Sequence, residues 1–137
     1  MLSSGYVKIQ RELNIYTLIM DKIDKIYRKI NQLYRLRVML LKRPLARPDI
    51  WISQYVKMVG TQCYTYAKWE SVTPIFKSKK DPEKKTRHEH IGRAGSTTGL
   101  SMDESVRIAY RLQRHRRWLD RVETAIGQIE SAIDVRF

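Results

Sequence analysis

The chain has 137 residues, of which 42% are hydrophobic and 30% charged, and this composition excludes a disordered polymer and fits one small domain. Its 27 Lys and Arg against 14 Asp and Glu give a net charge of +13. Such an excess opposes compaction by self-repulsion, and a phosphate backbone would relieve it, so we expect a polyanionic partner. An anionic membrane surface has the same sign, so charge alone does not separate the two.

Cysteine content and apolar run lengths indicate the compartment. The single cysteine, Cys63, excludes an intramolecular disulfide and a Cys-rich zinc site. The N-terminal stretch MLSSGYVKIQRELNIY lacks the pattern of a secretory signal, and apolar runs stay well below the roughly 18 residues that a membrane span needs. We expect a cytoplasmic protein, with nucleoid association as an option, and no membrane partner.

The first predicted element is a long amphipathic helix over about 6–43. Apolar residues recur in steps of three and four, without Gly or Pro between Tyr6 and Arg43, and Pro44 ends the pattern. The stripe consists of Ile9, Leu13, Tyr16, Met20, Ile23, Tyr27, Ile30, Tyr34 and Leu41. Its spacing is close to that of a coiled coil.

The middle segment, 44–76, is rich in aromatic and β-branched residues around Gly60. This favours a small β-hairpin, and a short helix starting at Pro48 and Asp49 is the alternative. Residues 77–100, rich in Lys, Gly and Ser, are expected to form a long basic loop.

The last predicted element is a second long helix over about 101–135. Ser101 and Glu104 have the spacing of a capping box, and an apolar repeat runs from Leu112 to Ile133. Neither helix can bury its stripe alone, so we expect an antiparallel pair within a single domain, 1–137, that is mainly α. A second copy or a partner helix could equally complete the stripes, which predicts a homo-oligomer.

Positive charge is concentrated in three stretches. Residues 22–47 sum to +8, 77–93 to +4 and 107–121 to +5, while the remaining segments are neutral or acidic. If the helices are antiparallel, these stretches meet at one end of the molecule. The sequence therefore predicts a cationic head on a nearly neutral stem.

Nucleic-acid contacts are predicted on one face of the last helix and in the basic loop. Arg107, Arg111, Arg114, Trp118 and Arg121 fall within an arc of about 80° on a helical wheel. Arginine can fork onto two phosphate oxygens, and tryptophan can stack on an unpaired base. The alternative is a solvated face. The full predicted set is Arg107, Arg111, Arg114, Arg117, Trp118 and Arg121 on the helix, with Lys77, Lys79, Lys80, Lys84, Lys85 and Arg87 in the loop.

Catalytic and metal chemistry find little support. His88 and His90 could share a metal ion, but further ligands are remote in sequence and the surroundings are cationic. The glycine-rich stretch 92–99 lacks the ending of a P-loop. We expect no enzyme activity, no metal, no cofactor and no small-molecule substrate.

The aromatic residues of the middle segment have two interpretations. Tyr55, Tyr64, Tyr66 and Trp69 are assigned to the core of the small sheet, and stacking on bases is the alternative.

Together these patterns indicate a non-enzymatic nucleic-acid-binding protein, a small regulatory or accessory factor that binds the phosphates of DNA or RNA. The alternative is a structural subunit of a larger assembly, such as a ribonucleoprotein or a viral particle.

Overall fold

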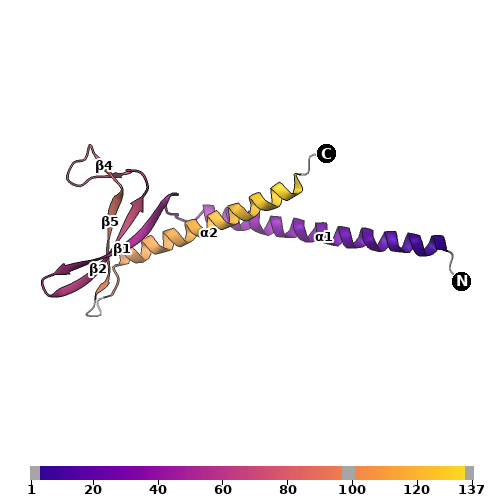
Figure 1. The fold of residues 1–137 in the computed structure, drawn as a ribbon, viewed down its shortest axis with the longest axis horizontal. Helices are drawn as coiled ribbons and strands as arrows, with labels where there is room; N and C mark the ends of the chain where they lie inside the picture. Colours follow the sequence, from indigo (N-terminus) through magenta and orange to yellow (C-terminus); the bar gives the residue numbers. More distant parts are fainter. Residues whose placement is uncertain (1–3, 97–100, 135–137) are drawn as a thin grey trace. The chain divides into compact units, whose positions relative to one another are not determined.

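The computed structural model describes residues 4–96 and 101–134, which form two long helices and five strands (Figure 1). The elements are α1 Ser4–Leu41, β1 Ile50–Val59, β2 Gln62–Ser71, β3 Phe76–Lys77, β4 Lys85–Thr86, β5 His88–Ser96 and α2 Glu104–Ile133. The predicted fold class is confirmed: an antiparallel helical pair with a small β segment. Within the described ranges, neither helix is both long and apolar enough to cross a bilayer.

Contacts divide the chain into two compact units. The helical unit consists of Met1–Met39 and Arg121–Phe137, and the sheet unit is Leu40–Asp120. That the whole chain behaves as one domain stays a prediction.

In the helical unit, α1 and α2 run antiparallel. Tyr34 of α1 donates a hydrogen bond to Glu130 of α2. Closer to the end of α2, Ile26 of α1 and Ile133 of α2 line a shared groove of about 360 Å³. The buried residues are Ile30, Val122 and Ile126. These residues come from the predicted apolar repeats, because the 3.6-residue period gathers them on one side of each helix.

Among the described residues of this unit, no helix lies beside the first half of α1. Figure 1 shows α1 continuing past the end of α2. The apolar side chains of α1 from Tyr6 to Tyr27, including those next to the end of α2, are 39–62% exposed, and they are Tyr6, Val7, Ile9, Leu13, Ile15, Tyr16, Leu18, Ile19, Met20, Ile23, Ile26 and Tyr27. A helix with so much apolar surface gains little stability from its own chain.

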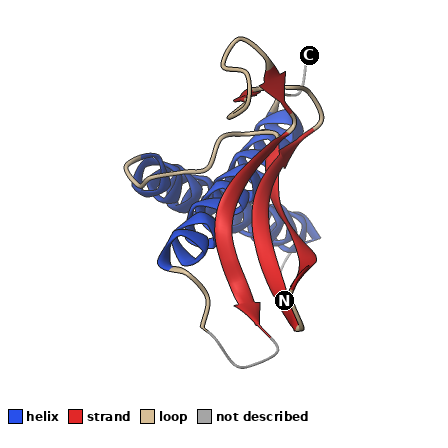
Figure 2. Ribbon diagram, turned by 90° about the vertical axis from the view of Figure 1, so that its left-hand side faces the viewer, coloured by secondary structure: helices blue, strands red, loops and turns tan. Residues whose placement is uncertain are grey.

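The sheet unit contains a three-stranded antiparallel sheet in the order β1-β2-β5, with helix against one side of it (Figure 2). β1 and β2 form a regular hairpin from Ile50 opposite Ser71 to Val59 opposite Gln62. Gly60 in the turn has φ of 65°, a conformation that glycine adopts without strain. The hairpin prediction is confirmed, and the short helix is excluded.

The basic loop predicted over 77–100 is wrong for most of its described length. Residues 88–96 form β5, which pairs with β2 from His88 opposite Glu70 to Ser96 opposite Tyr64, with two register shifts. Before it, β3 and β4 form a short hairpin whose turn is closed by a bond from the Ser78 amide to the Lys84 carbonyl at 2.9 Å. The His- and Gly-containing stretch 88–96 lacks the apolar alternation of a strand, and it is extended here because the free edge of β2 supplies its hydrogen bonds.

The predicted capping box at Ser101 is also wrong. The amides of Val106 and Arg107 bond to the Asp103 carbonyl, so Asp103 precedes the first residue of α2. The Asp103 carboxylate instead accepts from the Arg93 amide of β5 at 2.8 Å, and the Asp103 amide donates to the Arg93 carbonyl. The start of α2 is thereby fixed to β5.

Candidate nucleic-acid interface

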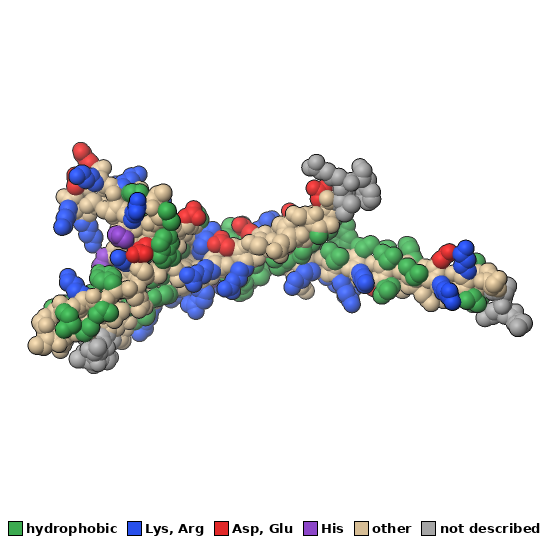
Figure 3. All heavy atoms as spheres, viewed as in Figure 1, with side chains coloured by type: hydrophobic (Ala, Val, Ile, Leu, Met, Phe, Trp, Pro, Cys, Tyr) green, Lys and Arg blue, Asp and Glu red, His purple; other side chains and the backbone are tan. Residues whose placement is uncertain are grey.

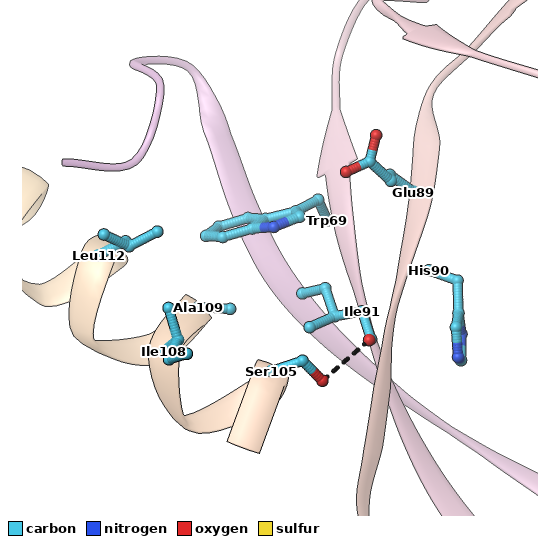
Figure 4. Close-up of a pocket in the computed structure, with 8 residues that line it drawn as sticks. All are labelled: Trp69, Glu89, His90, Ile91, Ser105, Ile108, Ala109 and Leu112. Atoms are coloured by element: carbon cyan, nitrogen blue, oxygen red, sulfur yellow. Dashed lines mark hydrogen bonds between the residues drawn. The ribbon is translucent and has the colours of Figure 1, made fainter. Parts of the chain in front are cut away.

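The packing of α2 on the sheet decides which of its sides faces solvent. Val106, Ala109 and Gln113 are buried, and Gln113 accepts a hydrogen bond from the Ile52 amide at 2.8 Å. Trp69 reaches from β2 toward Ala109 and Leu112 (Figure 4). The arginine side of the helix is consequently turned away from the sheet.

The predicted arginine row is exposed along the part of α2 that belongs to the sheet unit. Arg107, Arg111, Arg114, Arg117 and Trp118 are all exposed, and Trp118 remains 43% accessible. Among described residues, their only ion pair is a 4.0 Å contact between Arg107 and Glu104. The other guanidinium groups therefore have their charge available to a ligand. Arg121, also exposed, belongs to the helical unit and is not placed relative to the row.

A cleft beside the row adds a basic residue that the sequence did not single out. Arg43 and Arg111 line it together with His115, and its volume is about 330 Å³. The Arg43 guanidinium lies 3.5 Å from the His115 ring. The segment that carries Arg43 is held to α2 because Arg116 donates to the Ala46 carbonyl at 2.7 Å. Sequence spacing could not reveal this neighbourhood, since the two arginines are far apart in the chain.

The six loop residues that were predicted to bind nucleic acid lie on the β3–β4 hairpin or directly after it, and all six are exposed. They are Lys77, Lys79, Lys80, Lys84, Lys85 and Arg87. The hairpin is ordered by its own short side chains, because Ser78 accepts from the amides of Lys80 and Asp81. It is a structured basic element, and not the open loop expected from its composition.

Three of these lysines and two histidines line a second cleft. Lys77, Lys79, Lys80, His88 and His90 surround a volume of about 580 Å³, which is called here the lysine cleft. Figure 3 shows the histidines beside the Lys and Arg side chains of the hairpin. This cleft is separate from the arginine row: within the described residues no hydrogen bond or ion pair joins the two groups.

The tyrosine assignment to the core is wrong. Tyr55, Tyr64 and Tyr66 lie on the face of the sheet opposite α2, and none of them is buried. Trp69, on the other face, does pack against α2. Alternation along β2 separates the two sets, but both faces carry large residues, so the pattern alone could not tell which one is covered.

A carboxylate beside the tyrosines is already neutralised. Glu70 pairs with Lys68 at 3.2 Å and lies 3.5 Å from His88. Burial pushes the pKa of the Glu70 carboxyl up, but hydrogen bonds from Lys68, Ser53 and Trp51 outweigh this and place the pKa below its ordinary value. Glu70 thus stays ionised and compensated, and it adds little repulsion toward an anionic ligand.

The excess of positive charge is larger in the sheet unit than in the helical unit. The sheet unit has 17 basic and 8 acidic residues, and the helical unit has 10 basic and 6 acidic residues. Most of the excess therefore lies with the arginine row and the hairpin. Among described residues no group of three or more His, Cys, Asp or Glu is arranged to hold a metal ion.

Comparisons with protein-family models, with curated proteins and with solved structures find no match for this chain. Its function is therefore argued from the charge and geometry of its own residues.

Proposed function

We propose that this chain is a non-enzymatic nucleic-acid-binding protein that contacts the phosphate backbone through the sheet unit. The observation that carries the proposal is the arginine row: Arg107, Arg111 and Arg114 lie on one exposed helix face, and two of the three have no carboxylate partner among described residues. Unpaired guanidinium groups in line on a rigid helix match successive phosphate oxygens. Phosphate contacts of this kind position a protein on its ligand and carry no sequence information themselves.

The test is a salt titration of binding. Labelled duplex DNA, single-stranded DNA and RNA are titrated with the protein at several salt concentrations, and log K is plotted against log[salt]. Contact with about 4–8 phosphates gives a slope of roughly −4 to −7 on duplex DNA, because each neutralised phosphate contributes about −0.9. Changing Arg107, Arg111 and Arg114 together to Ala should flatten that slope by about 3.

A matched variant separates location from total charge. Lys8, Arg11 and Lys22 of α1 are exposed, and changing them to Ala removes the same three charges from the helical unit. We expect this variant to keep the wild-type slope. A wild-type slope near zero, or equal effects of both triple variants, would contradict the proposal.

We also propose that the exposed stripe of α1 is covered by a second copy of the chain. The apolar side chains of α1 between Tyr6 and Tyr27 are 39–62% exposed, so the area they leave uncovered is on the order of the roughly 800 Å² per partner that a standard interface buries. The heptad-like spacing of Tyr6, Ile9, Leu13 and Tyr16 suits helix-to-helix packing.

The same stripe supports a second candidate function, a structural subunit of a larger assembly. In that case the stripe is covered by different proteins. Sedimentation velocity of the purified chain separates the two: a discrete oligomer supports the first candidate, and a monomer with salt-independent nucleic-acid affinity supports the second.

A further inference from the structure

The face of the sheet opposite α2 carries an aromatic cluster ringed by cations. Its six members alternate with the residues that pack on the helix, and together they are called here the tyrosine face. They are Tyr55 from β1, Tyr64, Tyr66 and Lys68 from β2, and His90 and Arg93 from β5. Figure 4 shows His90 pointing away from α2, on the other side of the sheet from the Trp69 ring.

Tyr66 lies at the centre of this cluster. The Tyr55 ring is stacked on it with centroids 5.7 Å apart and planes inclined by 26°. The rings of Tyr64 and His90 lie 6.4 and 5.7 Å from it, tilted by 49° and 50°. The rings thus form a continuous surface across all three strands, and its members are half-buried or exposed.

Cations flank the rings without capping the centre. Lys68 Nζ lies 5.3 Å from the Tyr55 centroid, and Arg93 Cζ lies 4.8 Å from the Tyr64 centroid. Aromatic surface is not needed here for the core, since the core of this unit lies on the α2 side. Rings with basic groups at their edges are suited to flat, electron-rich groups joined by anionic linkages, and an unpaired nucleic-acid strand combines both.

The lysine cleft, lined by Lys77, Lys79 and Lys80, adjoins this surface. His90 belongs to the tyrosine face and also lines that cleft. A strand whose bases stack on the tyrosines therefore has cations beside it for its phosphates. Glu89 also lines the cleft and is its one carboxylate among the lining residues.

We infer that the tyrosine face is a base-stacking site that selects single-stranded nucleic acid over duplex. A duplex keeps its bases paired and stacked on one another, so it can offer this face only its backbone. The inference rests on the proposed function and adds to it a second surface that binds bases, distinct from the phosphate-binding arginine row.

The experiment compares two labelled strands of equal length and charge over the same series of salt concentrations: oligo-dT and an abasic deoxyribose phosphate strand. We expect the wild type to bind oligo-dT about tenfold more tightly than the abasic strand. Tyr64→Leu with Tyr66→Leu should remove that difference without changing affinity for the abasic strand, and the matched Tyr64→Phe with Tyr66→Phe should retain it because the rings remain.

The outcomes separate the two proposals. Equal wild-type affinity for both strands, with a normal salt slope, overturns the base-stacking site and leaves the phosphate-binding function. No salt-dependent binding of either strand overturns the proposed function itself.

A second measurement uses only the wild-type protein, so it holds even if the leucine variant does not fold. Oligo-dT carrying 4-thiothymidine is photo-crosslinked to the protein, which is then digested with trypsin. Cleavage after Lys57 and Lys68 yields the peptide 58–68, which contains Tyr64 and Tyr66. Adducts on this peptide support the inference, and adducts confined to peptides of α2 overturn it.

Discussion

Replacing Gly92 with alanine tests how the start of α2 is fixed to the sheet. A Cβ built at this position would lie 2.7 Å from Ser105 Oγ, 2.9 Å from Asp103 Oδ2 and 3.3 Å from a Val106 methyl. The first two atoms cannot simply swing aside, because Ser105 donates to the Ile91 carbonyl and Asp103 accepts from the Arg93 amide. The variant must therefore displace α2 from β5 or give up these bonds.

The expected cost follows from those contacts. Overpacking of this kind costs about 1–3 kcal/mol, and each hydrogen bond given up adds about 0.5–1.5 kcal/mol. We expect Gly92→Ala to lower the free energy of unfolding by about 3 kcal/mol, which shifts the urea midpoint by roughly 1–2 M. Tryptophan fluorescence reports the change, since Trp69 lies against α2 in this unit.

Gly127→Ala provides the matched control. Beyond the chain neighbours and the backbone of its own helix, no atom lies within 4 Å of a Cβ at Gly127 in α2, so alanine should raise stability by about 0.5–1 kcal/mol. A Gly92→Ala variant with an unchanged midpoint would refute the tight seating of α2 on β5.

Three other predictions concern the helices. Leu13→Glu places a charge in the exposed stripe of α1 and should dissociate the proposed oligomer at micromolar concentration, as measured by sedimentation velocity; an unchanged mass would argue against self-association through this stripe. The hydrogen bond to Glu130 raises the pKa of the Tyr34 hydroxyl. The stabilisation that this bond gives the folded state is therefore complete below the pKa of an unfolded tyrosine and is lost as pH rises through the raised pKa. Thermal melts should show a loss of stability at alkaline pH that Tyr34→Phe removes. Leu119→Ala, at a side chain 1% exposed, should cost about 3 kcal/mol in urea unfolding, whereas Leu18→Ala on exposed α1 should cost under about 0.5 kcal/mol in a monomer.

The two helices could be predicted because their signals are local. Apolar residues spaced three and four apart are close together within each helix, so the pattern can be read without knowing the rest of the fold. The observed bounds, Ser4–Leu41 and Glu104–Ile133, lie within three residues of those expected. The β1–β2 hairpin was predictable for the same reason, since Gly60 and the β-branched residues on either side of it are adjacent in sequence.

The third strand could not be predicted because its pairing depends on a distant partner. Nothing in the stretch from His88 to Ser96 alternates apolar with polar residues, and only the edge of β2 makes it extended. The cap was misplaced for a similar reason. Asp103 bonds to β5 by way of Arg93, and no spacing rule applied to residues 101–104 contains that contact.

The candidate site was predicted in part. The arginine row needed only a helical wheel, and those of its residues that lie in the sheet unit are exposed there. The assignment of Tyr55, Tyr64 and Tyr66 to the core is wrong, because which side of a sheet a helix covers depends on how the chain returns after β5. Arg43 was overlooked as a site residue since it reaches Arg111 only through folding.

One side of the sheet packs against α2 and the other side carries the tyrosine face, so substitutions on the two sides should have different effects on folding. Residues that contact α2, such as Ala67 and Gly92, hold the architecture, whereas Tyr55, Tyr66 and Lys68 point elsewhere. Substitutions on the outer side can therefore accumulate with little effect on folding. A laboratory selection that randomises only that side would have a scaffold already fixed beneath it, and new ligand preferences could be sought there without rebuilding the fold.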